Sequence, residues 1–229
     1  MRIIFSVTIV FLAGSFFSVG CKTNSTTNNK NQQIEIVEVV SETGRTWMDR
    51  NLGSERVAQS SNDRIAYGDL YQWGRFTDGH EKRDSFTSNI LMIDEQTGNS
   101  NFILTSRFPY NWSENVNNGL WQGVKGLNNP CPVNFRIPTV EEWENEFENF
   151  KSRDSEGAFD TTLKLTLTGF RTDSNGFILN EDSIGYYWAS DESQESAKVS
   201  GVSISSISIS VNTFYRARGM AVRCIKNEI

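Results

Sequence analysis

The chain has 229 residues, 37% hydrophobic and 12% aromatic, which is enough for one sizeable domain or two small ones with a core. Its 22 basic and 28 acidic side chains give a net charge of −6 and form no lysine or arginine cluster. Because nucleic-acid-binding domains present a basic face or stripe, we expect no nucleic-acid partner. A single histidine leaves little room for histidine-based chemistry.

Residues 1–20 are typical of a secretory signal peptide of the lipoprotein type. Arg2 supplies a minimal positive start, and an apolar run follows over residues 3–17. Ser, Thr and Gly interrupt that run, which is too short for a spanning helix of about 20 apolar residues. Residues 19–21 (Val-Gly-Cys) resemble the end of a bacterial lipobox, so we expect Cys21 to carry lipid. Ordinary signal cleavage with an unmodified cysteine is the alternative.

Residues 21–33 predict a flexible tether, because no apolar side chain follows the cysteine there and ordering the segment would bury nothing. The folded part is expected to be a single domain over residues 34–229. Its first element is a β-rich run over residues 34–40. A turn and a second strand at residues 46–48 follow.

Residues 51–129 predict long loops, since aromatic, Gly, Asn and Asp residues occur there without sustained periodicity. The densest aromatic patch is 67–75, and 108–112 continues the pattern. Long loops inside a domain are often functional, but the rings can also serve to hold loops on the sheet. His80 has no evident nucleophile or second metal ligand near it in sequence, so it is expected to be solvated or to stabilise a loop.

A helix is predicted to begin at a capping box formed by Thr139 and Glu142, directly after Pro138. Apolar residues at helical spacing form one face of this helix: Val140, Trp143, Phe147 and Phe150. Five glutamates lie mostly on the other side: Glu141, Glu142, Glu144, Glu146 and Glu148. Paired carboxylates can serve acid–base chemistry, but a solvated helix face explains these glutamates better.

The last third of the chain predicts β-structure, because apolar and polar residues alternate along it. The expected strands cover residues 163–167, 177–179, 185–188, 202–211 and 220–225. A turn at 173–176 (Asp-Ser-Asn-Gly) separates the first two. Ser205 and Ser206 interrupt the alternation of the fourth strand, which predicts a β-bulge.

Three cysteines are an awkward number for an exported protein, because one is left without a partner. If Cys21 carries lipid, Cys131 and Cys224 remain as an even pair in an oxidising compartment. The alternative is a reactive thiol, which needs an electropositive or histidine-assisted setting. Arg136 and Arg223 lie close in sequence but no histidine does, so we expect a disulfide.

Eight segments of the mature chain, taken in order, carry a resemblance to one family. They are 47–53 (WMDRNLG), 66–75 (AYGDLYQWGR), 78–80 (DGH), 129–132 (NPCP), 135–139 (FRIPT), 142–143 (EW), 185–190 (GYYWAS) and 222–224 (VRC). Together they resemble the Fibrobacter succinogenes major paralogous domain, a family of exported and lipid-anchored bacterial proteins. The resemblance implies an α+β, C-type-lectin-like fold of the kind shared with formylglycine-generating enzymes. Such a fold is loop-rich, with an antiparallel sheet and at least one packed helix.

Two classes of function are compatible with these observations. The first is a non-catalytic binding or adhesion module for a glycan or protein ligand, displayed on the cell surface or in the periplasm. In related C-type-lectin-like folds ligands dock before the last strand, and exposed aromatic and polar side chains suit sugars and protein hot spots. The residues expected to bind the ligand are Asp191, Glu192, Ser193, Asn212, Tyr215 and Arg216.

The alternative function is an oxidoreductase similar to the formylglycine-generating enzymes, which use a redox-active cysteine pair. The motif order places the two mature cysteines at fold-locking positions, so we expect no catalytic residue. The sugar-binding triplets of calcium-dependent lectins do not occur in the sequence, and we expect no metal and no cofactor. The membrane is contacted only through the lipid. Lys22 replaces the aspartate that retains lipoproteins at the inner membrane, which favours the outer membrane, on its periplasmic face or at the cell surface.

Overall fold

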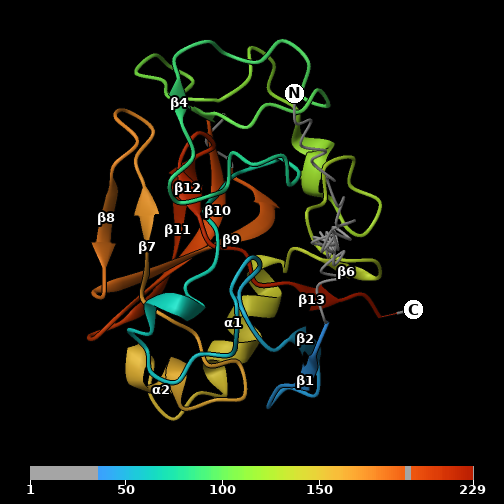
Figure 1. The fold of residues 1–229 in the computed structure, drawn as a ribbon. Coiled ribbons are helices and arrows are strands. Elements are labelled where there is room, and N and C mark those ends of the chain that lie inside the picture. The colour runs from blue at the N-terminus through green and yellow to red at the C-terminus, as the bar shows by residue number, and fades with distance from the viewer. Residues whose placement is uncertain (1–35, 194–196, 229) are drawn as a thin grey trace, which may run out of the picture. The chain divides into compact units, whose positions relative to one another are not determined.

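The computed structural model describes residues 36–193 and 197–228 (Figure 1). Several predictions lie outside the described residues: the signal peptide (1–20), the lipidated Cys21, the tether (21–33) and the start of the first strand at Ile34. Residues 36–229 form one compact unit. Among the described residues, no helix has both the length and the apolar character needed to cross a membrane.

The largest element of this unit is a seven-stranded sheet (Figure 1). Its strand order is β11-β10-β9-β7-β12-β3, and β8 pairs with β7. The pairs are antiparallel except for β7 and β9, which run parallel. The strands are β3 (Tyr71–Gln72), β7 (Thr168–Arg171), β8 (Ile178–Glu181), β9 (Ile184–Glu192), β10 (Lys198–Ser205), β11 (Ile209–Tyr215) and β12 (Gly219–Met220).

A smaller antiparallel sheet has the order β1-β2-β13-β6. Its strands are β1 (Glu38–Val40), β2 (Thr46–Met48), β6 (Phe135–Arg136) and β13 (Ile225–Lys226). The predicted first hairpin is therefore confirmed, with Gly44 at a φ of 82° in its turn. A parallel pair, β4 (Thr87–Ser88) and β5 (Phe102–Ile103), and two 3₁₀ turns, η1 (Arg64–Ala66) and η2 (Asn118–Trp121), lie in the loop-rich segment.

The predicted helix is α1, Val140–Glu148, and its capping box is confirmed. Thr139 Oγ1 accepts from the Glu142 N–H at 3.2 Å, and the Glu142 carboxylate accepts from the Thr139 N–H at 2.9 Å. A short second helix, α2 (Ser155–Phe159), follows with Asp154 as its N-cap. With two helices among its described residues and this much sheet, the protein has a sheet-rich α+β fold.

Apolar side chains cover both faces of the large sheet. Tyr187 on β9 packs in a cluster with Trp143 and Phe147 of α1. The next residue, Trp188, belongs to a second cluster, which contains Cys224. Successive strand residues point to opposite faces, so the two clusters lie on the two sides of β9. In Figure 1, α1 and α2 lie near one end of the large sheet, and the loops around β4 lie near the other.

The tryptophan side chains connect the loop-rich segment to the sheet. Each of them is at most 1% exposed, and each indole N–H has an acceptor. Trp73 donates to Ala189 O at 2.9 Å, Trp188 donates to Tyr71 O at 2.7 Å, and Trp112 donates to Trp73 O at 2.7 Å. The first two of these bonds join segments more than a hundred residues apart. The aromatic patch at 67–75 therefore holds loops on the sheet, as one of its two interpretations required.

The predicted strand at 163–167 is wrong. Its leucines are buried as the alternation requires, but Lys164 has a φ of 48°, which is outside the β region. The backbone bonds there go to loops and not to a strand, since the Leu167 N–H donates to Ser61 O at 2.7 Å. Strand β7 begins one residue after this segment, at Thr168.

The predicted strand at 202–211 is two strands, because Ser205 and Ser206 begin a hairpin turn and not a bulge. The Ser205 N–H donates to Ser208 O at 2.9 Å, and β11 then returns beside β10. The apolar alternation continues on both arms and therefore hides the turn. The last predicted strand, 220–225, is also interrupted, since β12 ends at Met220 and β13 begins at Ile225.

The predicted disulfide joins Cys131 and Cys224, with their Cα atoms 5.9 Å apart. Cys131 lies in the loop before β6, and Cys224 lies between β12 and β13. Cys224 is fully buried in the second core cluster, and Cys131 packs against that cluster. The bridge thus ties the start of the helical region to the last strands of both sheets.

Candidate functional site

The predicted ligand residues do not form one site. Asp191 Oδ2 accepts from the Val140 N–H at 2.6 Å, at the first residue of α1. A carboxylate at a helix N-terminus satisfies a free N–H and interacts favourably with the helix dipole. Asp191 therefore stabilises the start of α1. Ser193 follows β9, directly before the undescribed residues 194–196.

Asn212 and Tyr215 are separated along β11. Asn212 is paired with Gly201 and Tyr215 with Lys198, three residues apart, a distance of about 10 Å along a strand. An odd spacing also directs the two side chains to opposite faces. Asn212 Nδ2 donates to Ser203 Oγ at 2.8 Å on the exposed sheet surface. A ligand small enough for one site would not contact both residues.

Glu192 and Arg216 are brought together by Asn118. Asn118 Nδ2 donates to Glu192 Oε2 at 2.6 Å, and Arg216 Nη2 donates to Asn118 Oδ1 at 2.5 Å. Arg216 is only 3% exposed, contrary to the exposed position suggested by the sequence. Its guanidinium lies over the Trp73 ring at 4.3 Å, and burial lowers its pKa to about 10. Arg216 is therefore part of the structural core.

Tyr215 leads to a different surface, because its ring packs at a tilt against Tyr110 with centroids 4.4 Å apart. Tyr110 in turn meets the exposed Phe108 edge to face at 6.4 Å. Lys198 and Arg218 approach the Tyr215 ring at 5.6 and 5.9 Å. Of the six predicted residues, only Tyr215 is thus continuous with the loops that contain Phe108.

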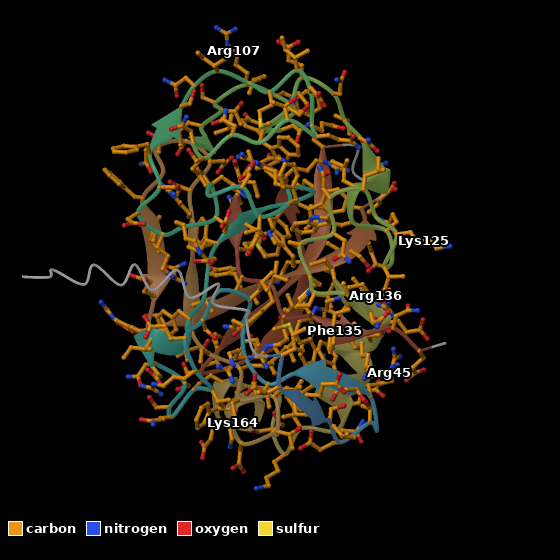
Figure 2. The ribbon with its side chains drawn as sticks, turned by 45° about the vertical axis from the view of Figure 1, so that its right-hand side comes forward. Arg45, Arg107, Lys125, Phe135, Arg136 and Lys164 are labelled. Carbon is orange, nitrogen blue, oxygen red and sulfur yellow. A yellow bond between two sulfur atoms is a disulfide. The ribbon has the colours of Figure 1, made fainter. Side chains whose placement is uncertain are left out.

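A cleft of about 690 Å³ opens in these loops, within the range of roughly 300–1,000 Å³ that small-molecule sites occupy. Its walls come from residues 89–91, from residues 104–114 and from Ser174 in the β7–β8 turn. Figure 2 shows Arg107, one of the lining residues, at the opposite end of the unit from Arg45 and Lys164. Both apolar and polar side chains line this cleft.

Two polar side chains in the cleft are available to a ligand, and a third polar group without a partner is buried in its wall. Among the described residues, the side chains of Arg107 and Glu114 have neither a hydrogen-bond nor an ion-pair partner, and both are exposed. Asn111 is 4% exposed, and its Oδ1 accepts no hydrogen bond. The sequence indicated residues 108–112 only as part of an aromatic pattern. The signal it passed over was the run of polar residues around that pattern.

Asp78, His80 and Glu81 have the composition of a metal site, and their ligand atoms lie within 4.8 Å of one another. The lone pair of His80 Nε2, however, accepts from the Gln72 N–H at 3.1 Å, and Nδ1 lies 2.5 Å from Asp78 Oδ1. The neutral imidazole therefore donates from Nδ1 to Asp78 and has no free lone pair for a metal. Burial lowers the pKa of His80 to about 4, so it is buried and neutral, not solvated. It stabilises its loop.

Glu146 differs from the solvated glutamates expected on α1, since it is 1% exposed. Its Oε1 accepts from Ser41 Oγ and Thr43 Oγ1, both at 2.6 Å, and from Trp47 Nε1 at 3.1 Å. Burial raises the pKa of this carboxyl group. A recess of about 360 Å³ lies beside it, but Glu146 is not among the residues that line it. The carboxyl group anchors the β1–β2 turn to α1.

Glu146→Gln is expected to stabilise the protein at pH 7–8 and to have little effect at pH 4. The pKa of Glu146 is higher in the folded than in the unfolded protein. The wild-type protein therefore loses stability as pH rises from the unfolded-state pKa of this group through its folded-state pKa. Glutamine is neutral at every pH and keeps the accepting oxygen. Thermal unfolding of both proteins between pH 4 and 8 measures the difference.

Glu146→Ala serves as the control for this prediction. It removes the acceptor that Ser41, Thr43 and Trp47 share. The two hydroxyls keep a bond to each other and to Arg45 O, whereas the buried Trp47 N–H is left unpaired, at about 1–3 kcal/mol. A glutamine variant as unstable as the alanine variant at pH 8 would show that the charge itself is needed.

Comparisons of the chain with protein-family models, with curated proteins and with solved structures found no match. Family membership and ligand are therefore inferred from the residues and their geometry alone. Of the features described, the cleft with its unpaired polar groups is the one best suited to bind a ligand.

Proposed function

We propose that this protein is a lipid-anchored binding module of the cell envelope, without catalytic activity, that takes a glycan or a protein as its ligand. The observation that carries this proposal is the cleft beside Phe108. There Arg107 and Glu114 are exposed and unpaired among the described residues, next to the acceptor of Asn111. Convergent polar groups beside an apolar surface are what a small binding site requires. Lipid on Cys21 would hold the module at the outer membrane.

The fold proposed for this module is the C-type-lectin-like variant of an α+β protein, and the family is the Fibrobacter succinogenes major paralogous domain. Support comes from the places that the family-like residues occupy. The Arg136 guanidinium donates to both oxygens of Glu142 at 2.7 Å, inside the Arg-Ile-Pro-Thr-x-x-Glu-Trp segment. Cys224 forms the disulfide, and Trp188 lies in the core. These are framework roles, which leaves ligand binding to the loops.

The binding proposal is tested with the full-length protein in detergent, on an array of glycans and of purified envelope proteins. We expect the double variant Arg107→Gln/Glu114→Gln to lose at least tenfold in affinity for whichever ligand the wild type binds. The affinity of Tyr215→Ala should fall less, because Tyr215 acts on the cleft only through its ring contact with Tyr110. Arg216→Ala is not a suitable probe, since that side chain is buried against Trp73.

The matched control is Lys125→Gln, which removes an exposed basic side chain at a distance from the cleft (Figure 2). It should bind as the wild type does. Equal binding by the double variant and the wild type would refute the cleft as the ligand site. No binding by the wild type to any glycan or envelope protein on the array would refute the module itself.

A further inference from the structure

The acceptor of Asn111 is the most specific feature of the cleft. Its Nδ2 donates to Ser113 O at 3.0 Å and to Asn115 O at 2.5 Å, and both partners are carbonyl oxygens. These two bonds fix which end of the amide is nitrogen, so the atom without a partner is the oxygen. A buried acceptor without a donor is costly to leave unpaired. The oxygen is itself buried, with less than 1 Å² of accessible surface, so a donor reaches it only by displacing the wall atoms that cover it.

The other polar groups of the cleft differ in whether they donate or accept hydrogen bonds. The Arg107 guanidinium can only donate, whereas the Glu114 carboxylate, like Asn111 Oδ1, can only accept. Ser113 and Ser174, which also line the cleft, can do either. A ligand that fits this set must present donors and acceptors close together. Hydroxyl groups meet this requirement, because each one both donates and accepts.

The cleft also offers an apolar platform. The Phe108 side chain is 72% exposed, and Pro109 lines the cleft beside it. The loop is held from behind: the Tyr110 N–H donates to Arg107 O at 2.8 Å, and the Ala217 N–H donates to Tyr110 O at 3.1 Å. These bonds fix the backbone beside Phe108, and its exposed ring can stack on an apolar face of a ligand.

An extended peptide fits the cleft less well, because several backbone N–H groups of its walls are already paired. The Leu104 N–H donates to Ser88 O, and the Thr105 N–H donates to Asp173 O, both at 2.7 Å. The Glu114 N–H likewise donates to Met92 O at 2.9 Å. Peptides that add a strand to a sheet need free N–H and C=O groups at an edge. Recognition in this cleft must therefore use side chains.

We propose that the cleft is a saccharide-binding site. The Phe108 ring stacks on the face of one sugar ring, Glu114 accepts from its hydroxyl groups, and Arg107 donates to a hydroxyl or ring oxygen. This assignment rests on the proposed binding function and specifies its ligand class. None of these contacts requires a metal ion.

The test is calorimetric titration of the full-length protein, in a detergent without a sugar headgroup, with oligosaccharides of three kinds: neutral hexoses, N-acetylhexosamines and uronates. We expect at least one kind to bind. Phe108→Ala and Arg107→Gln should each weaken that binding at least tenfold. Phe177→Ala removes a ring of similar exposure (67%) that does not line the cleft, and Lys125→Gln removes a basic side chain elsewhere, so both should bind as the wild type does.

The outcomes separate this inference from the function on which it rests. Saccharide binding that survives both Phe108→Ala and Arg107→Gln would overturn the site. If no oligosaccharide binds but an envelope protein does, and Arg107→Gln/Glu114→Gln abolishes that binding, the saccharide assignment is wrong and the binding module stands. If the wild type binds neither class, both proposals are wrong. Because Phe108 and Arg107 are exposed, their replacement leaves the fold intact, which circular dichroism checks.

Discussion

Replacement of Cys131 and Cys224 together by alanine is expected to lower the free energy of unfolding by about 4–5 kcal/mol. The bridge closes a loop with a sequence separation of 93, which contains both helices and most strands of the large sheet. Cross-linking so long a loop restricts the unfolded chain far more than the folded one. Alanine suits Cys224 because that position is fully buried and a serine hydroxyl would lack an assured partner.

Guanidinium unfolding of the wild type, of the reduced wild type and of the double variant measures this effect. The two forms without the bridge should unfold at similar, lower denaturant concentrations. Thiol titration of the denatured wild type without reductant should find neither Cys131 nor Cys224 free. Equal midpoints for all three proteins, or two titratable thiols from this pair, would contradict a structural role for the bridge.

Replacement of Arg223 by lysine is expected to cost about 3–5 kcal/mol, although the charge is kept. Arg223 is 1% exposed, and its guanidinium reaches in two directions. Nε and Nη2 donate to Asn51 Oδ1 at 3.1 and 2.8 Å, and Nη1 donates to Leu163 O at 2.6 Å. A planar fork can span these acceptors, whereas an ammonium group donates from a single point. The lysine variant would therefore contain a buried and poorly paired cation.

The pH dependence of Arg223→Lys distinguishes this cause from a simple packing defect. Burial lowers the pKa of Arg223 to about 10, and the same loss of hydration should lower the pKa of a lysine at this position. A cation with a lowered folded-state pKa destabilises the protein below that pKa. Stability then recovers as pH rises toward the ordinary lysine pKa of about 10.4. Unfolding curves of Arg223→Lys should thus move toward those of the wild type between pH 7 and 9.

Arg223→Met is the matched control, since it keeps much of the side-chain volume and has no charge to titrate. It leaves Asn51 Oδ1 and Leu163 O unpaired, at about 1–3 kcal/mol for each. Its difference from the wild type should not change between pH 7 and 9. A lysine variant as stable as the wild type at pH 7 would mean that the guanidinium geometry is not needed.

Local sequence signals correctly predicted the elements that are held by bonds between residues close in sequence. The capping box at Thr139 forms as predicted, because its two hydrogen bonds join residues three apart. The Asp173–Gly176 turn also forms, with Gly176 at a φ of 74° and β8 following as the return arm. The disulfide was predictable from cysteine count and compartment, provided that Cys21 carries lipid.

The alternation of apolar and polar residues failed to predict strands correctly where a strand and another buried structure show the same pattern. Residues 163–167 bury their leucines without joining a sheet, and residues 202–211 fold back at Ser205. Burial sets the apolar pattern, whereas strand pairing depends on which backbone groups are free nearby. Glu146 and His80 show the same limit for polar residues. Glu146 is satisfied by donors distant in sequence, and His80 by Gln72 and Asp78, which only the fold of their loop brings into bonding position.

The sequence by itself determined the helix start, the β1–β2 and β7–β8 turns and the cysteine pair, since each depends on neighbouring residues or on composition. The tertiary structure alone decided that Arg216 is buried on Trp73, that Tyr215 joins Tyr110, and that the cleft contains an unpaired Asn111 oxygen. These features arise where loops that are separate along the chain meet. Their geometry depends on how the tryptophans hold those loops against the sheet, which no local pattern encodes.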